Sequence, residues 1–258
     1  MIIDTHMHLY DNKYDGIREE VIKEALDMGV KKMIAVGFDY ASSVEAVKLA
    51  NTYDFIYAAI GLHPSEVEKE SDHNLSWIYE LAKNKKVVAI GEIGLDYYWD
   101  KTYVELQKEY FHHQLAIAKE LNLPVIIHAR DAQFDSLEVV SKHPGVIGVF
   151  HCFGGSLETA QRLIKLGYYI GVGGVLTFKN AKEIKRVVDG ISLDYILSET
   201  DSPYLAPHPH RGELNHPGYT KYVVEEIAKR KEMAFDEVCN ILEKNALTLF
   251  KLGEKDEK

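Results

Sequence analysis

Residues 87–92 read Val-Val-Ala-Ile-Gly-Glu, an apolar run that stops at a charged residue. A continuous apolar run of this length predicts a strand that is covered on both faces, as in a parallel sheet. Segments with helical spacing of apolar residues, such as 106–121 and 157–164, separate it from similar runs. Seven more such runs occur, at residues 1–4, 32–36, 56–60, 124–127, 146–150, 168–172 and 195–197.

The alternation of these runs with helical segments predicts the fold class. Eight strands separated by helices favour an α/β TIM barrel, (β/α)8, over the alternative of an open doubly wound sheet. Pro and Gly form no linker-like cluster between two halves, so we expect one domain over residues 1–258. Residues 221–252 predict two further helices with a break near 231–236.

The composition disfavours membrane-spanning proteins and proteins held together by disulfides or thiolate zinc sites. The 258 residues are 46% hydrophobic and 27% charged, which is typical of a soluble globular protein. No apolar run is long enough for a transmembrane helix, so no membrane partner is expected. Two cysteines, Cys152 and Cys239, are too few for a disulfide framework or a thiolate zinc cluster, and favour a reducing, cytoplasmic location.

Two further absences bear on ligands. The chain contains no G-x-x-x-x-G-K-[ST] and no G-x-G-x-x-G after its first strand, so no nucleotide cofactor is expected. The net charge of −10 disfavours tight non-specific binding of DNA. It leaves room for an acidic substrate that is held locally by metal ions or a few arginines.

Histidines and carboxylates follow the predicted strands at the end where barrel enzymes carry their chemistry. His6 and His8 are two apart on an extended strand, so both point to the same side. Imidazole and carboxylate ligands suit zinc, manganese, iron or nickel. The residues that share this position, and that we predict to bind metal, are His6, His8, Glu92, His128, His151 and Asp201.

Six ligands are too many for one tetrahedral zinc and suit two ions that share a carboxylate. Glu92 is the expected bridge, because a carboxylate has two oxygens. The expected cofactor is two divalent ions per chain, with zinc, manganese, nickel or magnesium as candidates. One ion would take His6, His8 and Asp201, and the other His128 and His151. A metal-carrying binding module is a weaker alternative, because a closed structural site would not use so many ligands.

These residues lie within motifs that resemble the TatD family of metal-dependent deoxyribonucleases, in the amidohydrolase superfamily. The motifs run in family order at residues 4–8 (DTHMH), 61–64 (GLHP), 91–98 (GEIGLDYY), 128–130 (HAR), 151–153 (HCF) and 199–205 (ETDSPYL). Arg211, Gly212, Asn215 and Pro217 extend the likeness, although Glu213 and His216 replace a usual lysine and glutamate. The resemblance implies a TIM barrel, a binuclear metal centre and phosphodiester hydrolysis.

We therefore predict a metal-dependent hydrolase that acts on DNA, as an exonuclease that favours single strands. Asp201 is expected to orient the attacking water and take its proton, beside the bridging Glu92. The alternative is hydrolysis of amide, lactone or aminoacyl ester bonds, since the activated water is the same. We expect a monomer or a weak oligomer.

Three residues are candidates to hold the substrate phosphate: His63, Arg130 and Arg211. The guanidinium fork suits two phosphate oxygens at once. Arg130 has an alternative role in an ion pair with Asp131 or another carboxylate. The aromatic run 97–99 is expected either to stack on a base or to pack at the foot of a loop.

Overall fold

The computed structural model describes residues 1–98 and 101–253. All eight predicted strands are present and pair in parallel, in chain order, in one sheet. They are β1 Ile2–Met7, β2 Val30–Val36, β3 Ile56–Ile60, β4 Val87–Asp96, β5 Val125–Arg130, β6 Gly148–Phe150, β7 Tyr168–Val172 and β8 Ile196–Ser198. Between β8 and β1 the sheet nearly closes, through a bridge of Met7 with Ser202 and a hydrogen bond from Ser198 Oγ to the Ile3 carbonyl.

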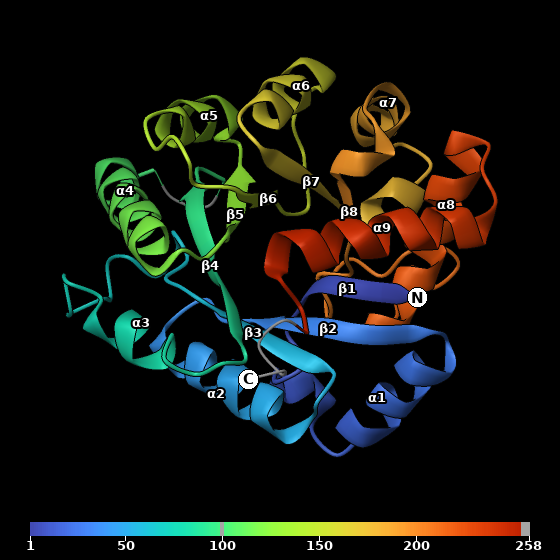
Figure 1. The fold of residues 1–258 in the computed structure, drawn as a ribbon, viewed down its shortest axis with the longest axis horizontal. Helices are drawn as coiled ribbons and strands as arrows, with labels where there is room; N and C mark the ends of the chain where they lie inside the picture. The colour runs from blue at the N-terminus through green and yellow to red at the C-terminus, as the bar shows by residue number, and fades with distance from the viewer. Residues whose placement is uncertain (99–100, 254–258) are drawn as a thin grey trace.

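Helices surround the strands and complete the predicted TIM barrel (Figure 1). They are α1 Arg18–Asp27, α2 Tyr40–Thr52, α3 Ser76–Leu81, α4 Val104–Leu121, α5 Gln133–Ser141, α6 Leu157–Lys165, α7 Lys182–Gly190, α8 Thr220–Lys231 and α9 Phe235–Phe250. Short 3-10 turns lie at η1 Asn12–Tyr14, η2 Gly174–Thr177, η3 Leu193–Tyr195 and η4 Pro217–Tyr219. Among the residues described, none of these helices is both long and apolar enough to span a membrane.

One end of the barrel is covered by α9, which crosses the strands in Figure 1. Alternate strand residues such as Ile34 point into the barrel, where they pack with Leu249 and Phe250 of α9. The Asn245 side-chain amide donates to the carbonyl of Ile196, the first residue of β8, at 2.9 Å. This helix therefore closes the amino-terminal end of the barrel, and the loops after the strands are left to form the other end.

Strand β4 differs from the prediction, which ended it at Gly91 and Glu92. It continues to Asp96, because the register with β5 shifts between Ile90 and Ile93 and pairing then resumes. A Cβ on Gly91 would lie 2.6 Å from Ile126 Cβ, so only glycine allows so close an approach of the two strands. The extension carries Glu92 and Asp96 on one strand toward the carboxyl end of the barrel.

Candidate metal centre

The six predicted ligands meet at the carboxyl end of the barrel, and we call them, together with His63, the rim cluster. They come from β1, β4, β5 and the residues that follow β1, β3, β6 and β8. His6 is fully buried and Glu92 is only 5% exposed. Ionisable groups at this depth are costly unless they are paired or bind a metal, so the burial itself calls for a compensating charge.

Glu92 lies at the middle of the rim cluster, and its two oxygens face different imidazoles. Oε1 is 2.7 Å from His151 Nε2 and 2.9 Å from His128 Nδ1. Oε2 is 3.6 Å from His6 Nε2. A carboxylate that bridges two ions must present one oxygen to each of two ligand sets, and Glu92 has this arrangement.

The two sets have spacings suited to shared metal ions. His6 Nε2 and His8 Nε2 are 3.2 Å apart, and Asp201 Oδ1 is 3.4 Å from His8 Nε2. In the second set, His128 Nδ1 lies 3.2 Å from His151 Nε2. Tetrahedral ligands at about 2.0–2.1 Å from zinc lie about 3.3–3.4 Å from each other. Both sets therefore fit divalent ions that take nitrogen and oxygen ligands.

Hydrogen bonds outside the two sets fix how the imidazoles face. His8 Nδ1–H donates to the Val36 carbonyl at 2.8 Å, which leaves the Nε2 lone pair directed at His6 and Asp201. His128 Nε2 is 2.9 Å from Asp96 Oδ2, and a proton shared there leaves Nδ1 as a lone pair facing Glu92. Lone pairs that face one another in this way can share a proton or a metal ion, so the arrangement fits a metal.

Asp96 was missed by the sequence analysis because the strand was expected to stop before it. Its position four residues after Glu92 could have indicated a site residue, since residues four apart on a strand share a face. Burial would raise the pKa of Asp96, but the hydrogen bonds from His128 and from the Tyr98 backbone outweigh it and lower that pKa. Asp96 is thus an ionised partner that orients His128.

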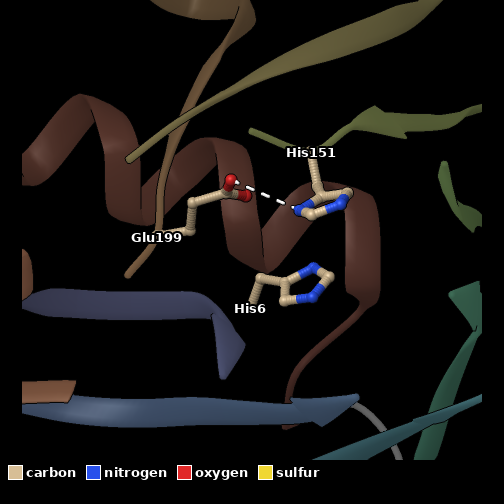
Figure 2. Close-up of side chains that lie close together, drawn as sticks. All are labelled: His6, His151 and Glu199. Carbon is tan, nitrogen blue, oxygen red and sulfur yellow. Dashed lines mark ion pairs between the residues drawn. The ribbon is translucent and has the colours of Figure 1, made fainter. Parts of the chain in front are cut away.

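Glu199 was also missed as a site residue, and the structure buries it completely beside His6 and His151 (Figure 2). Its Oε1 lies 3.7 Å from His151 Nδ1 and also accepts the Cys152 backbone N–H. The His6 and His151 rings stack with centroids 4.0 Å apart. In an extended chain Glu199 shares a side with Asp201, two residues on, and that spacing was the available signal.

Asp4 ties the two ends of the sheet together beneath the rim cluster. Its Oδ1 accepts the backbone N–H groups of His6 and Thr200 at 3.2 and 3.0 Å, and its Oδ2 accepts the Thr200 hydroxyl at 2.6 Å. Complete burial raises the pKa of Asp4 to about 8, against the effect of these hydrogen bonds. This network holds His6 on β1 next to Asp201, which follows β8.

The electrostatics of the rim cluster keep its carboxylates ionised, which is the form of a carboxylate that binds cations. Burial opposes ionisation of Glu92, but the charge of His151 and the hydrogen bonds with His128 and His151 set its pKa well below its ordinary value. Burial likewise opposes ionisation of Asp201, and the neighbouring histidines lower its pKa. Burial, aided by the charge of His128, lowers the pKa of His63 to about 3, which keeps that imidazole neutral.

The three residues predicted to hold substrate are placed differently. His63 joins the rim cluster, with Nε2 3.7 Å from Glu92 Oε1 and its ring edge-on to His128. The Arg130 guanidinium lies 3.7 Å from the centroid of the Tyr98 ring, and Arg211 lies at the same distance from Phe178. Trp99, the last residue of the aromatic run, lies outside the described residues.

The two departures from the family loop find partners close by. Glu213 Oε2 lies 2.8 Å from His210 Nδ1. His216 is buried, accepts the Gly218 backbone N–H at the start of η4, and lies 3.7 Å from Glu24 of α1. Both residues are therefore accommodated within the loop and its support.

Comparison with known proteins adds a family to this geometry. The model of the family described as TatD related DNase matches residues 3–251. YabD of Bacillus subtilis, named an uncharacterised metal-dependent hydrolase, is 48% identical over 255 residues, which cover 98% of this chain and 100% of that protein. YcfH of Escherichia coli, named in the same way, is 36% identical over 254 residues, 96% of this chain and 95% of that protein.

Solved structures support the same family assignment. The crystal structure of YjjV, a TatD homologue from Escherichia coli, has a TM-score of 0.91 and 35% identity, covering 97% of this chain and 98% of that one. The phosphotriesterase homology protein from Escherichia coli shares the fold alone, with a TM-score of 0.68, 14% identity and coverage of 96% and 98%. Family model, relatives and structure all span nearly the whole length. The chain therefore belongs to the TatD-related DNase family of metal-dependent hydrolases.

Proposed function

We propose that this protein hydrolyses phosphodiester bonds of DNA, as an exonuclease that favours single strands. The observation that carries the proposal is the position of Glu92, whose two oxygens face two separate sets of imidazoles. Two cations side by side are the usual means of stabilising an in-line displacement at phosphorus. The family adds support, because its model is described as TatD related DNase.

In this proposal each residue of the rim cluster has a stated role. His6, His8 and Asp201 would hold one divalent ion, His128 and His151 would hold the other, and Glu92 is placed to serve both. Such ions supply Lewis acidity toward phosphoryl oxygens and acidify water. Zinc, manganese, nickel and magnesium are the candidates.

Asp201 is the residue that we assign to the attacking water. Its side chain is 17% exposed, whereas that of His6 is fully buried, so it lies at the open side of the rim cluster. From there Asp201 orients the water and accepts its proton. His63, Arg130 and Arg211 are assigned to the substrate phosphates, where the two guanidinium groups can each contact two oxygens.

The proposal also covers the setting in which the protein works. We propose a single functional unit over residues 1–258 that acts as a monomer or weak oligomer, without a nucleotide cofactor. Both cysteines are free thiols, which suits a reducing compartment such as the cytoplasm.

The test is incubation of protein loaded with each candidate metal with single-stranded DNA labelled at one end. A ladder with single-nucleotide steps is the expected result, and double-stranded DNA of the same sequence should be cut more slowly. Absence of cleavage with all four metals would overturn the proposal and turn attention to amide, lactone and aminoacyl ester substrates.

A further inference from the structure

Tyr204 is an exposed aromatic residue beside the rim cluster that the proposed function does not use. Its ring centroid is 6.3 Å from that of His8, and the residue is 47% exposed. Two other rings, Tyr10 and Phe38, also contact His8 edge-on, but both are less exposed than Tyr204. Tyr204 is therefore the ring of this group that a substrate can reach.

The backbone under this ring is firmly held. The Tyr204 N–H donates to the Asp201 carbonyl at 2.9 Å. The Tyr204 carbonyl accepts a hydrogen bond from Asn215, a buried residue whose own carbonyl accepts the Tyr14 hydroxyl. A ring on so fixed a backbone offers contact area at a small cost in conformational entropy.

A cation accompanies the ring. Lys13 Nζ lies 4.4 Å from the Tyr204 ring centroid, and Lys13 is exposed on η1, the turn that follows β1. Since a ring has two faces, a cation over one leaves the other for a base. Two similar pairs, Arg130 with Tyr98 and Arg211 with Phe178, also come from segments at or after the ends of strands.

We propose that Tyr204 and Lys13 form a nucleotide subsite beside the metal centre. The Tyr204 ring stacks on the base next to the phosphate being cut, and the Lys13 ammonium binds the adjoining phosphate. Combinations of aromatic rings and cations bind single strands without regard to sequence, because every base has a π-face. In a protein of net charge −10, a few such local contacts also explain how a polyanion is held at all. This inference rests on the proposed function and adds a substrate contact to it.

The test compares Tyr204→Ala and Tyr204→Phe in metal-loaded protein. The substrates are a single-stranded oligonucleotide and the same oligonucleotide with abasic residues at the cleaved end. Tyr204→Ala should raise KM for the normal strand by about 5- to 150-fold, the range expected for one stacked base, with little change in kcat. Tyr204→Phe should behave as wild type, and neither variant should differ from wild type on the abasic strand.

Matched control variants distinguish the loss of a stacking contact from an unspecific effect of substituting an exposed residue. Tyr195, 38% exposed on η3 before β8, lies toward the opposite end of the barrel, so Tyr195→Ala should leave KM unchanged. Lys13→Ala should reduce the log–log salt slope of binding by about 0.7, one phosphate contact on a single strand. Lys48→Ala, which removes an exposed lysine paired with Glu45 on α2, should not change the slope.

Three results would overturn the subsite. Tyr204→Ala affects normal and abasic strands equally, Tyr204→Phe behaves like Tyr204→Ala, or Lys13→Ala leaves the salt slope unchanged. If wild-type protein cuts neither strand, the proposed function fails instead. The subsite is then tested by binding alone, with a 2-aminopurine base at the strand end. Its fluorescence should be quenched by wild type and Tyr204→Phe but not by Tyr204→Ala, and equal quenching by all three would overturn the subsite.

Discussion

Two groups of close histidines in this molecule have opposite surroundings. In the rim cluster, five imidazoles are packed around Glu92, Asp201 and the neighbouring Glu199. On the outside of the barrel, His112 of α4 and His143, just after α5, place Nδ1 and Nε2 only 2.7 Å apart. The charge of Lys142 acts on His112 more strongly than that of Glu138, and the charges of His112 and Lys119 act on His143.

The difference shows that close imidazoles can have neighbours of opposite charge. Burial would lower the pKa of His151, yet the charges of Glu92 and Glu199 and their hydrogen bonds raise it well above its ordinary value. Burial and the nearby lysine lower the pKa of His112, where no such carboxylate dominates. Carboxylates thus dominate the surroundings of the rim histidines but not those of the outer pair, and removing them is the way to test this comparison.

The largest effect is expected for Glu92→Ala. Because the two oxygens of Glu92 face the two ligand sets, the variant should bind less than one ion per chain, against up to two in wild type, and should lose hydrolysis. Elemental analysis of protein purified in parallel measures the metal. His143→Gln, a change in the outer pair, is the matched control and should keep both its metal and its activity. Full occupancy in Glu92→Ala would show that Glu92 is not a bridge.

Asp201→Asn should separate metal binding from chemistry. Asparagine keeps an oxygen near His8 but cannot accept the proton, so kcat should fall by about 10²–10⁴ while most metal is retained. Steady-state kinetics beside elemental analysis provide the measurement. Unchanged kcat would leave Asp201 as a ligand at most.

Glu199→Ala should weaken metal binding by about 10–100-fold, which is the usual cost of losing a partner that orients a ligating histidine. The cause is indirect, since Glu199 contacts the Nδ1 side of His151 while Nε2 faces Glu92. Chelator competition measures the metal affinity. Glu199→Gln keeps the size of the side chain, so its metal affinity should lie between those of wild type and Glu199→Ala. If kcat at saturating metal fell while affinity did not, Glu199 would have a role in chemistry instead of positioning.

The sequence was sufficient to predict the barrel and the meeting of six side chains at one end of it. Apolar runs report burial, and parallel strands carry their carboxyl ends to one edge, so His6 and Glu92 could be placed without coordinates. The groups that orient the histidine side chains are harder to predict from the sequence when they come from a neighbouring strand. The orientation of His8 by the Val36 carbonyl depends on a backbone atom that has no sequence signature. Asp96 depends on a register shift in β4 that apolar patterning does not reveal.

The smallest effect concerns the outer pair and the pH dependence of folding. Burial lowers the pKa of both His112 and His143 below the ordinary 6.5, aided by Lys142 at His112 and by His112 and Lys119 at His143. The folded chain therefore takes up these protons less readily than the unfolded chain. Their contribution to stability is therefore present above pH of about 6.5 and is lost as the pH falls toward the folded pKa values.

His143→Gln removes one proton site and should make Tm fall less between pH 7.5 and 5.5 than in wild type. The difference should stay below about 4 °C, because a half-exposed pair contributes under about 1 kcal/mol. Metal released from the rim cluster at low pH affects both proteins equally and cancels in this comparison. A larger fall of Tm in His143→Gln than in wild type would mean that the pair is stabilised by protonation, and the contrast between the two histidine groups would then be wrong.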